Sequence, residues 1–121
     1  MKKIFLLLWF VLLGLFEVQA YQFEKNGIYY DIVNGKAVVV SGDVSYSGDV
    51  VIPDSVEYDD VYLEVDSIGE YAFQKSESLS SIVLPKSLTS IGESAFSGCS
   101  GLVSIVLPKS LTSIGESAFS G

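Results

Sequence analysis

Apolar residues return at a fixed spacing through the second half of the chain. The stretch SIVLPKSLTSIGESAFSG occurs twice without a change, at 81–98 and at 104–121, which sets the repeat period at 23 (104 − 81). DSIGEYAFQKSESL, which begins at Asp66, is a diverged copy, and VVIPDSV at 50–56 resembles IVLPKSL. A single unit of this size cannot bury its own apolar residues, so copies at a fixed period predict a solenoid of stacked coils.

Within each unit, the pattern L-x-x-I-x-L predicts one short strand. It reads LSSIVL at 79–84 and LVSIVL at 102–107. Alternate side chains of a strand share a face, so we expect Ile82 and Leu84 to point inward and Val83 to point outward. At a period between about 20 and 29 residues, this pattern is typical of leucine-rich repeats.

After the strand, each unit is expected to turn and return across the coil. Pro85 ends the strand because it has no N–H to donate to a central ladder. Gly92 is predicted to permit a sharp corner. The segment 93–98 is too short for a regular helix but suits one helical turn, in which Ala95 and Phe96 fill the interior.

The residues before the repeats predict antiparallel hairpins. Two alternating runs, 28–33 and 37–40, flank Asn34-Gly35, the strongest short hairpin signal because both turn positions need positive φ. A further strand is expected at 46–52 and a second hairpin that turns at Asp59-Asp60. The predicted fold class is a β-rich leucine-rich-repeat solenoid, a right-handed coil with short parallel strands and one-turn helical corners, preceded by an N-terminal β-hairpin cap.

The segment 1–20 has the three parts of a secretory signal peptide. Lys2 and Lys3 precede an apolar run at 4–16, and the small residues Val18 and Ala20 follow it. That run is shorter than the roughly 20 residues that span a bilayer as a helix. We therefore expect cleavage after Ala20 and a secreted or cell-surface protein, with an uncleaved membrane anchor as the alternative.

These patterns divide the chain into three parts. We predict a signal peptide at 1–20, a β cap at 21–49 and leucine-rich repeats of period 23 at 50–121, the first with a hairpin insert at 57–64 and the last incomplete. The missing end of the last repeat predicts a truncated sequence. The alternative is a short protein whose open C-terminal repeat edge pairs with another copy.

Charge and composition exclude several classes of function. The net charge of −8 becomes −9 without Lys2, Lys3 and Glu17 (−8 − 2 + 1), which disfavours binding to nucleic acid. The chain has no histidine, which excludes sites that need imidazole, and one cysteine, Cys99, which excludes an internal disulfide framework. Cys99 is interpreted as a small buried residue rather than a nucleophile. We expect no cofactor, no metal and no enzymatic activity.

Three groups of polar residues have a functional and a structural interpretation. An acidic run has oxygen ligands for calcium but no EF-hand spacing, so an exposed hairpin is favoured. Glu70, Glu93 and Glu116 are expected to form a solvated ladder rather than a catalytic pair. All seven tyrosines precede Ala72. We expect them to pack within the cap rather than to form a platform that binds glycans. The residues of the acidic run are Asp54, Glu57, Asp59, Asp60, Glu64 and Asp66.

The outward strand face is the predicted partner surface. Solenoids present extended surfaces of this kind, and this one carries valines where water is expected. The alternative is that small serine and valine side chains only propagate the sheet. The predicted surface consists of Ser81, Val83, Lys86, Ser104, Val106 and Lys109.

The phrases VLPKSLTSIGESAFSGCSGL and GIYYDIVNGKAVVV resemble the BspA-like, or Treponema pallidum type, leucine-rich repeat family and the segment that often precedes its repeats. The resemblance implies a secreted or surface protein, and some such proteins resemble adhesins for host matrix or cells. The expected function is a non-enzymatic exported module for protein–protein or cell-surface interaction. The alternatives are a structural cap or spacer of a longer surface protein and, least favoured, an acid–base hydrolase.

Overall fold

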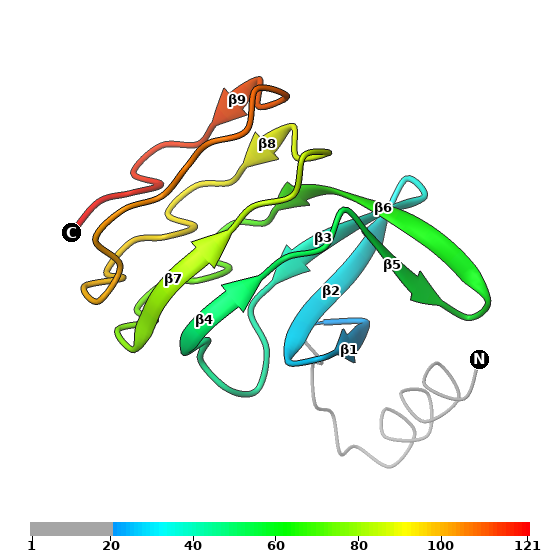
Figure 1. Cartoon of the computed structure of the whole chain (residues 1–121), viewed down its shortest axis with the longest axis horizontal. Helices are drawn as coiled ribbons and strands as arrows, with labels where there is room; N and C mark the ends of the chain where they lie inside the picture. Colours follow the sequence, from blue (N-terminus) through cyan, green and yellow to red (C-terminus); the bar gives the residue numbers. More distant parts are fainter. Residues whose placement is uncertain (1–20) are drawn as a thin grey trace, which may run out of the picture.

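The computed structural model describes residues 21–121. Coils stack side by side toward the C-terminus, and hairpins cover the other end of the stack (Figure 1). One sheet has the strand order β1-β2-β3-β6-β8-β9, with β5 also paired to β6, and β4 and β7 form a second sheet. The predicted signal peptide lies outside the described residues, and the division at 49/50 stays a prediction.

The N-terminal hairpins form as the turn signals indicate. β1 (Phe23–Lys25), β2 (Ile28–Val33) and β3 (Lys36–Val40) are antiparallel neighbours. Asn34 and Gly35 have φ of 52° and 76°, the left-handed values that a tight hairpin turn requires. The hairpin predicted at this dipeptide is therefore confirmed.

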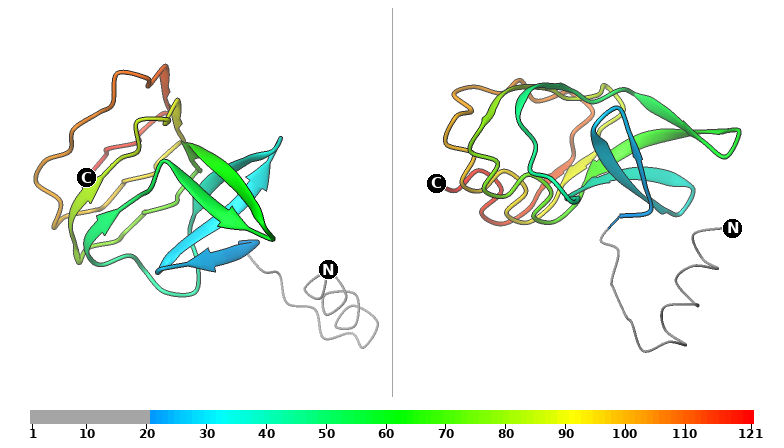
Figure 2. Two further views of the ribbon diagram at one scale, coloured as in Figure 1. Left: turned by 45° about the vertical axis from the view of Figure 1, so that its right-hand side comes forward. Right: turned by 90° about the horizontal axis from the view of Figure 1, so that it is seen from below.

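A second hairpin projects from the stack (Figure 2). Its strands are β5 (Ser55–Tyr58) and β6 (Val61–Ile68), and both Asp59 and Asp60 at its turn have positive φ. β6 is the longest strand because its first half pairs with β5 and its second half belongs to the parallel sheet of the coils.

The parallel sheet carries the predicted file of isoleucines. β3 pairs with β6 in parallel, and β6 is followed by β8 (Ser90–Ile91) and β9 (Ser113–Ile114). Ile68, Ile91 and Ile114 are direct partners across these strands. Ile68 is 1% exposed and Ile91 2%, whereas Ile114 on the last coil is 47% exposed. The solenoid with parallel strands is confirmed, and its right-handed sense stays a prediction.

The second sheet contains only one of the two strands predicted from L-x-x-I-x-L. β7 (Leu79–Val83) pairs in parallel with β4 (Gly48–Val51), and Ile82 is buried while Val83 is 55% exposed, as expected. The strand predicted at 102–107 is wrong, because the structure assigns no strand there. This segment leaves Val103 and Val106 90% and 83% exposed, so little burial offsets the entropy of ordering it.

The corners are turns rather than the predicted one-turn helices, and residues 21–121 contain no helix. Ser94 has a φ of 52° and Gly98 one of 76°, and left-handed residues interrupt a right-handed helix. The corners instead bond to the next coil. Phe73 N donates to Ala95 O at 2.7 Å, and Phe96 N donates to Ala118 O at 2.7 Å.

Gly92 is required for a reason that the sequence did not show. Its φ is not in the left-handed region, so the corner does not need a glycine for conformational freedom. A Cβ atom on Gly92 would lie 2.7 Å from Glu70 N and 2.8 Å from Gly69 C on the preceding coil. The glycine therefore permits close approach of two coil backbones.

The core of the stack contains a column of aromatic rings. The ring centroids of Tyr46 and Phe73 are 4.2 Å apart, those of Phe73 and Phe96 are 4.9 Å apart, and those of Phe96 and Phe119 are 5.4 Å apart. The last pair is parallel, with an interplanar angle of 0°. The column links the cap to the identical repeats, since Tyr46 lies before the first of them.

Candidate functional site

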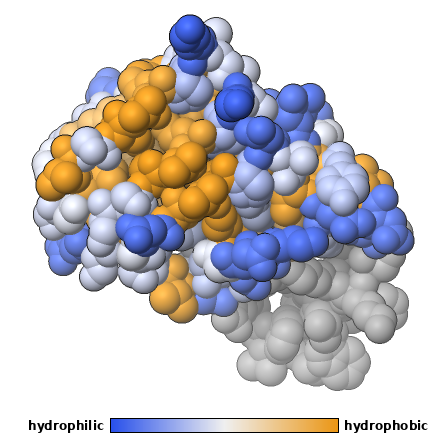
Figure 3. Space-filling model, in the orientation of Figure 1, coloured by the Kyte–Doolittle hydropathy of each residue, from blue (hydrophilic) through white to orange (hydrophobic). Residues whose placement is uncertain are grey.

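An apolar file crosses the outward face of the β4–β7 sheet and continues onto the next coil, where residues 102–107 form no strand. Val51 and Val83 are direct partners in the parallel register, and Val106 lies one period after Val83. Their exposed fractions are 64%, 55% and 83%. Figure 3 shows the apolar surface that gathers on this face of the stack. We call Val51, Val83 and Val106 the valine file.

Polar residues border the valine file. Asp49 pairs with Ser81, whose Oγ donates to Asp49 Oδ1 at 2.7 Å. The backbone N of Lys86 donates to Asp54 Oδ1 at 2.8 Å, which fixes the start of the segment that carries this lysine. The surface thus has an apolar centre and a polar border, as protein interfaces commonly do.

The structure divides the six predicted surface residues between two kinds of segment. Ser81 and Val83 lie together on β7, whereas Ser104 and Val106 lie on the segment that forms no strand. The four residues and both lysines, Lys86 and Lys109, are exposed. The predicted surface omitted Asp49 and Val51. The match between VVIPDSV and IVLPKSL aligns Val51 with Val83, and Asp49, two residues earlier on the strand, shares that face by alternation.

Repeated hydroxyl groups hold each coil to the preceding one. Ser87 Oγ donates to Val65 O at 2.6 Å, and Ser110 Oγ donates to Leu88 O at 2.6 Å. Each serine directly follows a lysine of the predicted surface. The repeated sequence KS therefore combines a bond to the neighbouring coil with an exposed charge.

Cys99 lies in the core rather than in an accessible site. It is 7% exposed, and its Sγ donates to Phe73 O at 3.0 Å. Burial raises the pKa of the thiol, which disfavours the thiolate that a nucleophile requires. The small buried residue expected from the repeat is what the structure contains.

Two carboxylates of the acidic run, those of Glu64 and Asp66, have separate partners. Glu64 Oε1 pairs with Lys36 Nζ at 2.9 Å, and Ser67 Oγ donates to Asp66 Oδ1 at 2.7 Å. Across residues 21–121 the structure brings together no group of three or more metal-ligating side chains. Glu70, Glu93 and Glu116 are exposed, as expected for a solvated ladder.

Several tyrosines pack inside the cap. Tyr46 is 5% exposed, its hydroxyl donates to Val40 O at 2.6 Å, and the same oxygen accepts a hydrogen bond from Tyr29 N at 3.0 Å. Burial raises the pKa of Tyr30 to about 12 and raises that of Tyr46 as well. Tyr62, by contrast, is 72% exposed on the projecting hairpin.

A family model described as "BspA type Leucine rich repeat region (6 copies)" matches residues 60–121. The chain belongs to this BspA-type family. Leucine-rich repeat proteins are generally non-enzymatic, and their repeats generally mediate protein interactions. A comparison with curated protein sequences finds no match.

Three crystal structures have similar folds. A leucine-rich cell surface protein from Faecalibacterium prausnitzii has a TM-score of 0.68 and 22% identity, over 85% of this chain and 28% of that one. The T. pallidum leucine-rich repeat protein has a TM-score of 0.68 and 28% identity, over 82% and 45% of the two chains. A leucine-rich repeat protein from Bacteroides ovatus has a TM-score of 0.59 and 31% identity, over 84% and 33%.

The chain spans less than half the length of each of these three proteins. The first of them is named a leucine-rich cell surface protein. No helix within residues 21–121 is long and apolar enough to cross a membrane.

Proposed function

We propose that this chain is an exported, non-enzymatic module that binds a protein or cell-surface ligand through the valine file and its polar border. The observation that carries the proposal is the exposure of Val51 and Val83, partners on the face of the β4–β7 sheet, together with that of Val106 one period further on. An adhesin role is consistent with the name of the F. prausnitzii protein, which is a cell-surface protein.

The energetics of this face suit an interface core. Burying an exposed valine at an interface contributes about 1.5 kcal/mol to the free energy of binding, or somewhat less when the side chain is already partly covered. Three valines in one file thus contribute several kcal/mol, which is on the order of a hundredfold or more in affinity. Lys86 and Lys109 at the border favour an acidic or hydrogen-bonding rim on the partner.

The double variant Val83→Ser, Val106→Ser is expected to weaken binding to a ligand of this face at least tenfold, because it removes apolar area from the centre of the surface. Biolayer interferometry against a panel of immobilised extracellular-matrix proteins measures the change. Val61→Ser is the matched control, since Val61 is 56% exposed at the turn of the projecting hairpin. Unchanged binding by the double variant would contradict the proposal.

A second candidate is a structural cap or spacer within a longer surface protein. The observation that favours it is the small share of the three crystal structures that this chain spans. The same panel separates the two functions, because a spacer binds nothing above the background of an unrelated protein. Self-association through the last coil is a further proposal, supported by Ile114 and Phe119, which are 47% and 43% exposed there.

Export is part of the proposal and has its own test. When the full chain is produced in a secreting host, N-terminal sequencing of the exported protein is expected to begin at Tyr21, because cleavage follows Ala20. A protein that stays membrane-bound and retains Met1 would support the anchor instead.

A further inference from the structure

We propose that the free edge of β4 binds an extended, basic segment of a partner protein as an added β-strand. This site shares Val51 with the valine file but uses the backbone of that residue rather than its side chain. The file lies on the face of the β4–β7 sheet, whereas the proposed strand pairs with the backbone at its edge.

The hydrogen bonds of β4 show which backbone groups face this edge. Gly48 N donates to Ser78 O at 2.8 Å, and Ile52 N donates to Val83 O at 3.0 Å. Successive residues of a strand direct their backbone groups to opposite sides, so Asp49 and Val51 direct theirs away from β7. Within residues 21–121, β4 pairs with no strand other than β7. The edge thus presents N–H and C=O groups at two positions.

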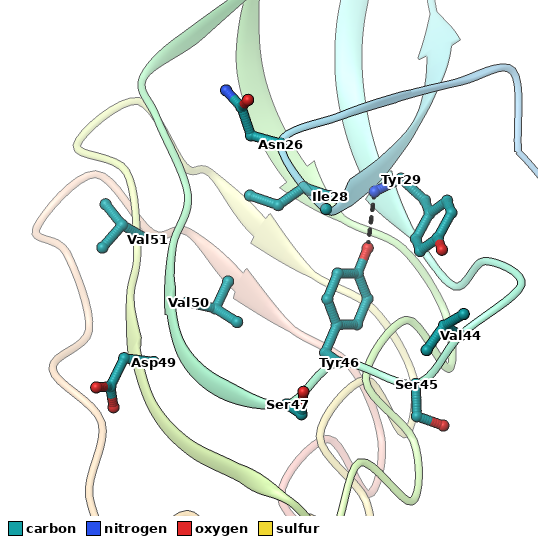
Figure 4. Close-up of a pocket in the computed structure, with 11 residues that line it drawn as sticks. Asn26, Ile28, Tyr29, Val44, Ser45, Tyr46, Ser47, Asp49, Val50 and Val51 are labelled. Atoms are coloured by element: carbon teal, nitrogen blue, oxygen red, sulfur yellow. Dashed lines mark hydrogen bonds between the residues drawn. The ribbon is translucent and has the colours of Figure 1, made fainter.

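A hollow lies along this edge (Figure 4). Its volume is about 330 Å³, and it separates Ser47 and residues 49–51 from the facing segment 26–29. A second hollow of about 350 Å³ continues past Val51 to Pro53 and Tyr62. Asn26, Ile28 and Val51 line both hollows, so the two adjoin along β4.

The wall of the first hollow is held in place before any partner binds. Tyr46 is buried, and its hydroxyl joins Tyr29 N to Val40 O through two hydrogen bonds. Its ring also packs against Phe73 in the core. A preformed wall reduces the entropy lost on binding, which favours an added strand.

The chemistry of the edge selects an extended backbone as the occupant. The backbone N–H and C=O groups that face this edge belong to Asp49 and Val51, two residues apart, and are therefore about 6.8 Å apart along the strand. The backbone of another strand has the same spacing. Exposed edges are therefore templates for strand pairing. Pro53 has no N–H, so the paired segment on β4 is short.

Charge favours a basic partner over a second copy of this chain. Residues 21–121 carry 14 acidic and five basic side chains, a net charge of −9. Asp49 and Glu57 line the hollows, and the one lysine there, Lys25, donates its Nζ to Glu57 O at 3.2 Å. A second copy would bring the same negative charge to this edge.

The test uses a synthetic peptide of alternating valine and lysine, acetylated and amidated, titrated into the 15N-labelled protein. Slowed amide exchange of Asp49 and Val51 is expected, because both N–H groups enter a ladder. A peptide of the same sequence with every second amide N-methylated on the pairing side is expected to bind at least tenfold more weakly. Equal binding of the two peptides would show attraction by charge alone and overturn the proposal.

The matching protein variant is Val51→Pro. It removes an N–H that points away from β7, and proline is tolerated at such edge positions, so the β4–β7 pair is expected to persist. We expect at least tenfold weaker peptide binding, with the amide shifts of β7 unchanged. Val83→Ser, Val106→Ser is expected to bind the peptide normally, which separates this site from the valine file. Unaltered exchange of Asp49 and Val51 in the wild-type protein, or their protection by self-association without peptide, would refute the inference.

Discussion

Phe96→Ala is expected to lower the free energy of unfolding by about 4 kcal/mol, as buried phenylalanines typically do when truncated to alanine. Phe96 is 3% exposed and stacks between Phe73 and Phe119 with centroid distances of 4.9 and 5.4 Å. The cavity would interrupt the aromatic column between two coils. Urea unfolding followed by circular dichroism measures the loss, which is a large part of the stability of a domain of this size.

Phe119→Ala is the control that the duplicated sequence supplies. Phe119 occupies the same place in a letter-for-letter copy, yet it is 43% exposed and has a ring neighbour on one side only. Phe119→Ala is expected to lower the free energy of unfolding by less than about 1.5 kcal/mol, because part of the ring is already exposed to solvent and its removal leaves only a small cavity. Equal losses for the two variants would show that the coils do not share one continuous core.

These two phenylalanines show what a sequence period predicts. The period places Ile68, Ile91 and Ile114 in one file, and the strand register confirms it. It says nothing about exposure, because burial depends on whether a further coil covers the residue. Identical letters therefore have different surroundings.

The local geometry of the coils could not be predicted as well from the sequence. The segment ESAFSG is compatible with a helical turn, but Ser94 takes a left-handed φ so that the corner bonds to the next coil. LVSIVL at 102–107 has the strand pattern and still forms no strand. At the corner, bonds between coils override the local preference, whereas at 102–107 too little apolar surface is buried to order a strand.

The candidate surface was partly predictable. Alternation in LSSIVL identifies Val83 as exposed, and the structure agrees. β4 pairs with β7 in parallel, although the two strands are distant in the sequence. This pairing brings Val51 beside Val83 and leaves one edge of β4 free. The match between VVIPDSV and IVLPKSL indicates that the two strands are equivalent, but it does not show that the other edge of β4 has no partner strand within residues 21–121.

Gly92→Ala is expected to lower the free energy of unfolding by about 3 kcal/mol, at the upper end for an overpacked site. The new Cβ atom would lie 2.7 Å from Glu70 N and 2.8 Å from Gly69 C. Both are backbone atoms, so no side chain can rotate away to relieve the contact. The neighbouring bond from Gly92 N to Ile68 O, 2.8 Å long, would have to lengthen as the coils separate. Urea unfolding measures the change.

Gly69→Ala tests this explanation at the same place in the preceding coil. A Cβ atom there would lie 3.2 Å from Val39 O and 3.3 Å from Val40 Cγ1, so a shift of a few tenths of an ångström accommodates it. Alanine also restricts the unfolded chain, which offsets part of the cost. We therefore expect a loss of about 1 kcal/mol or less for Gly69→Ala, against about 3 for Gly92→Ala. If the two variants were equally stable, close approach of the coil backbones would not be the reason for the repeated glycine.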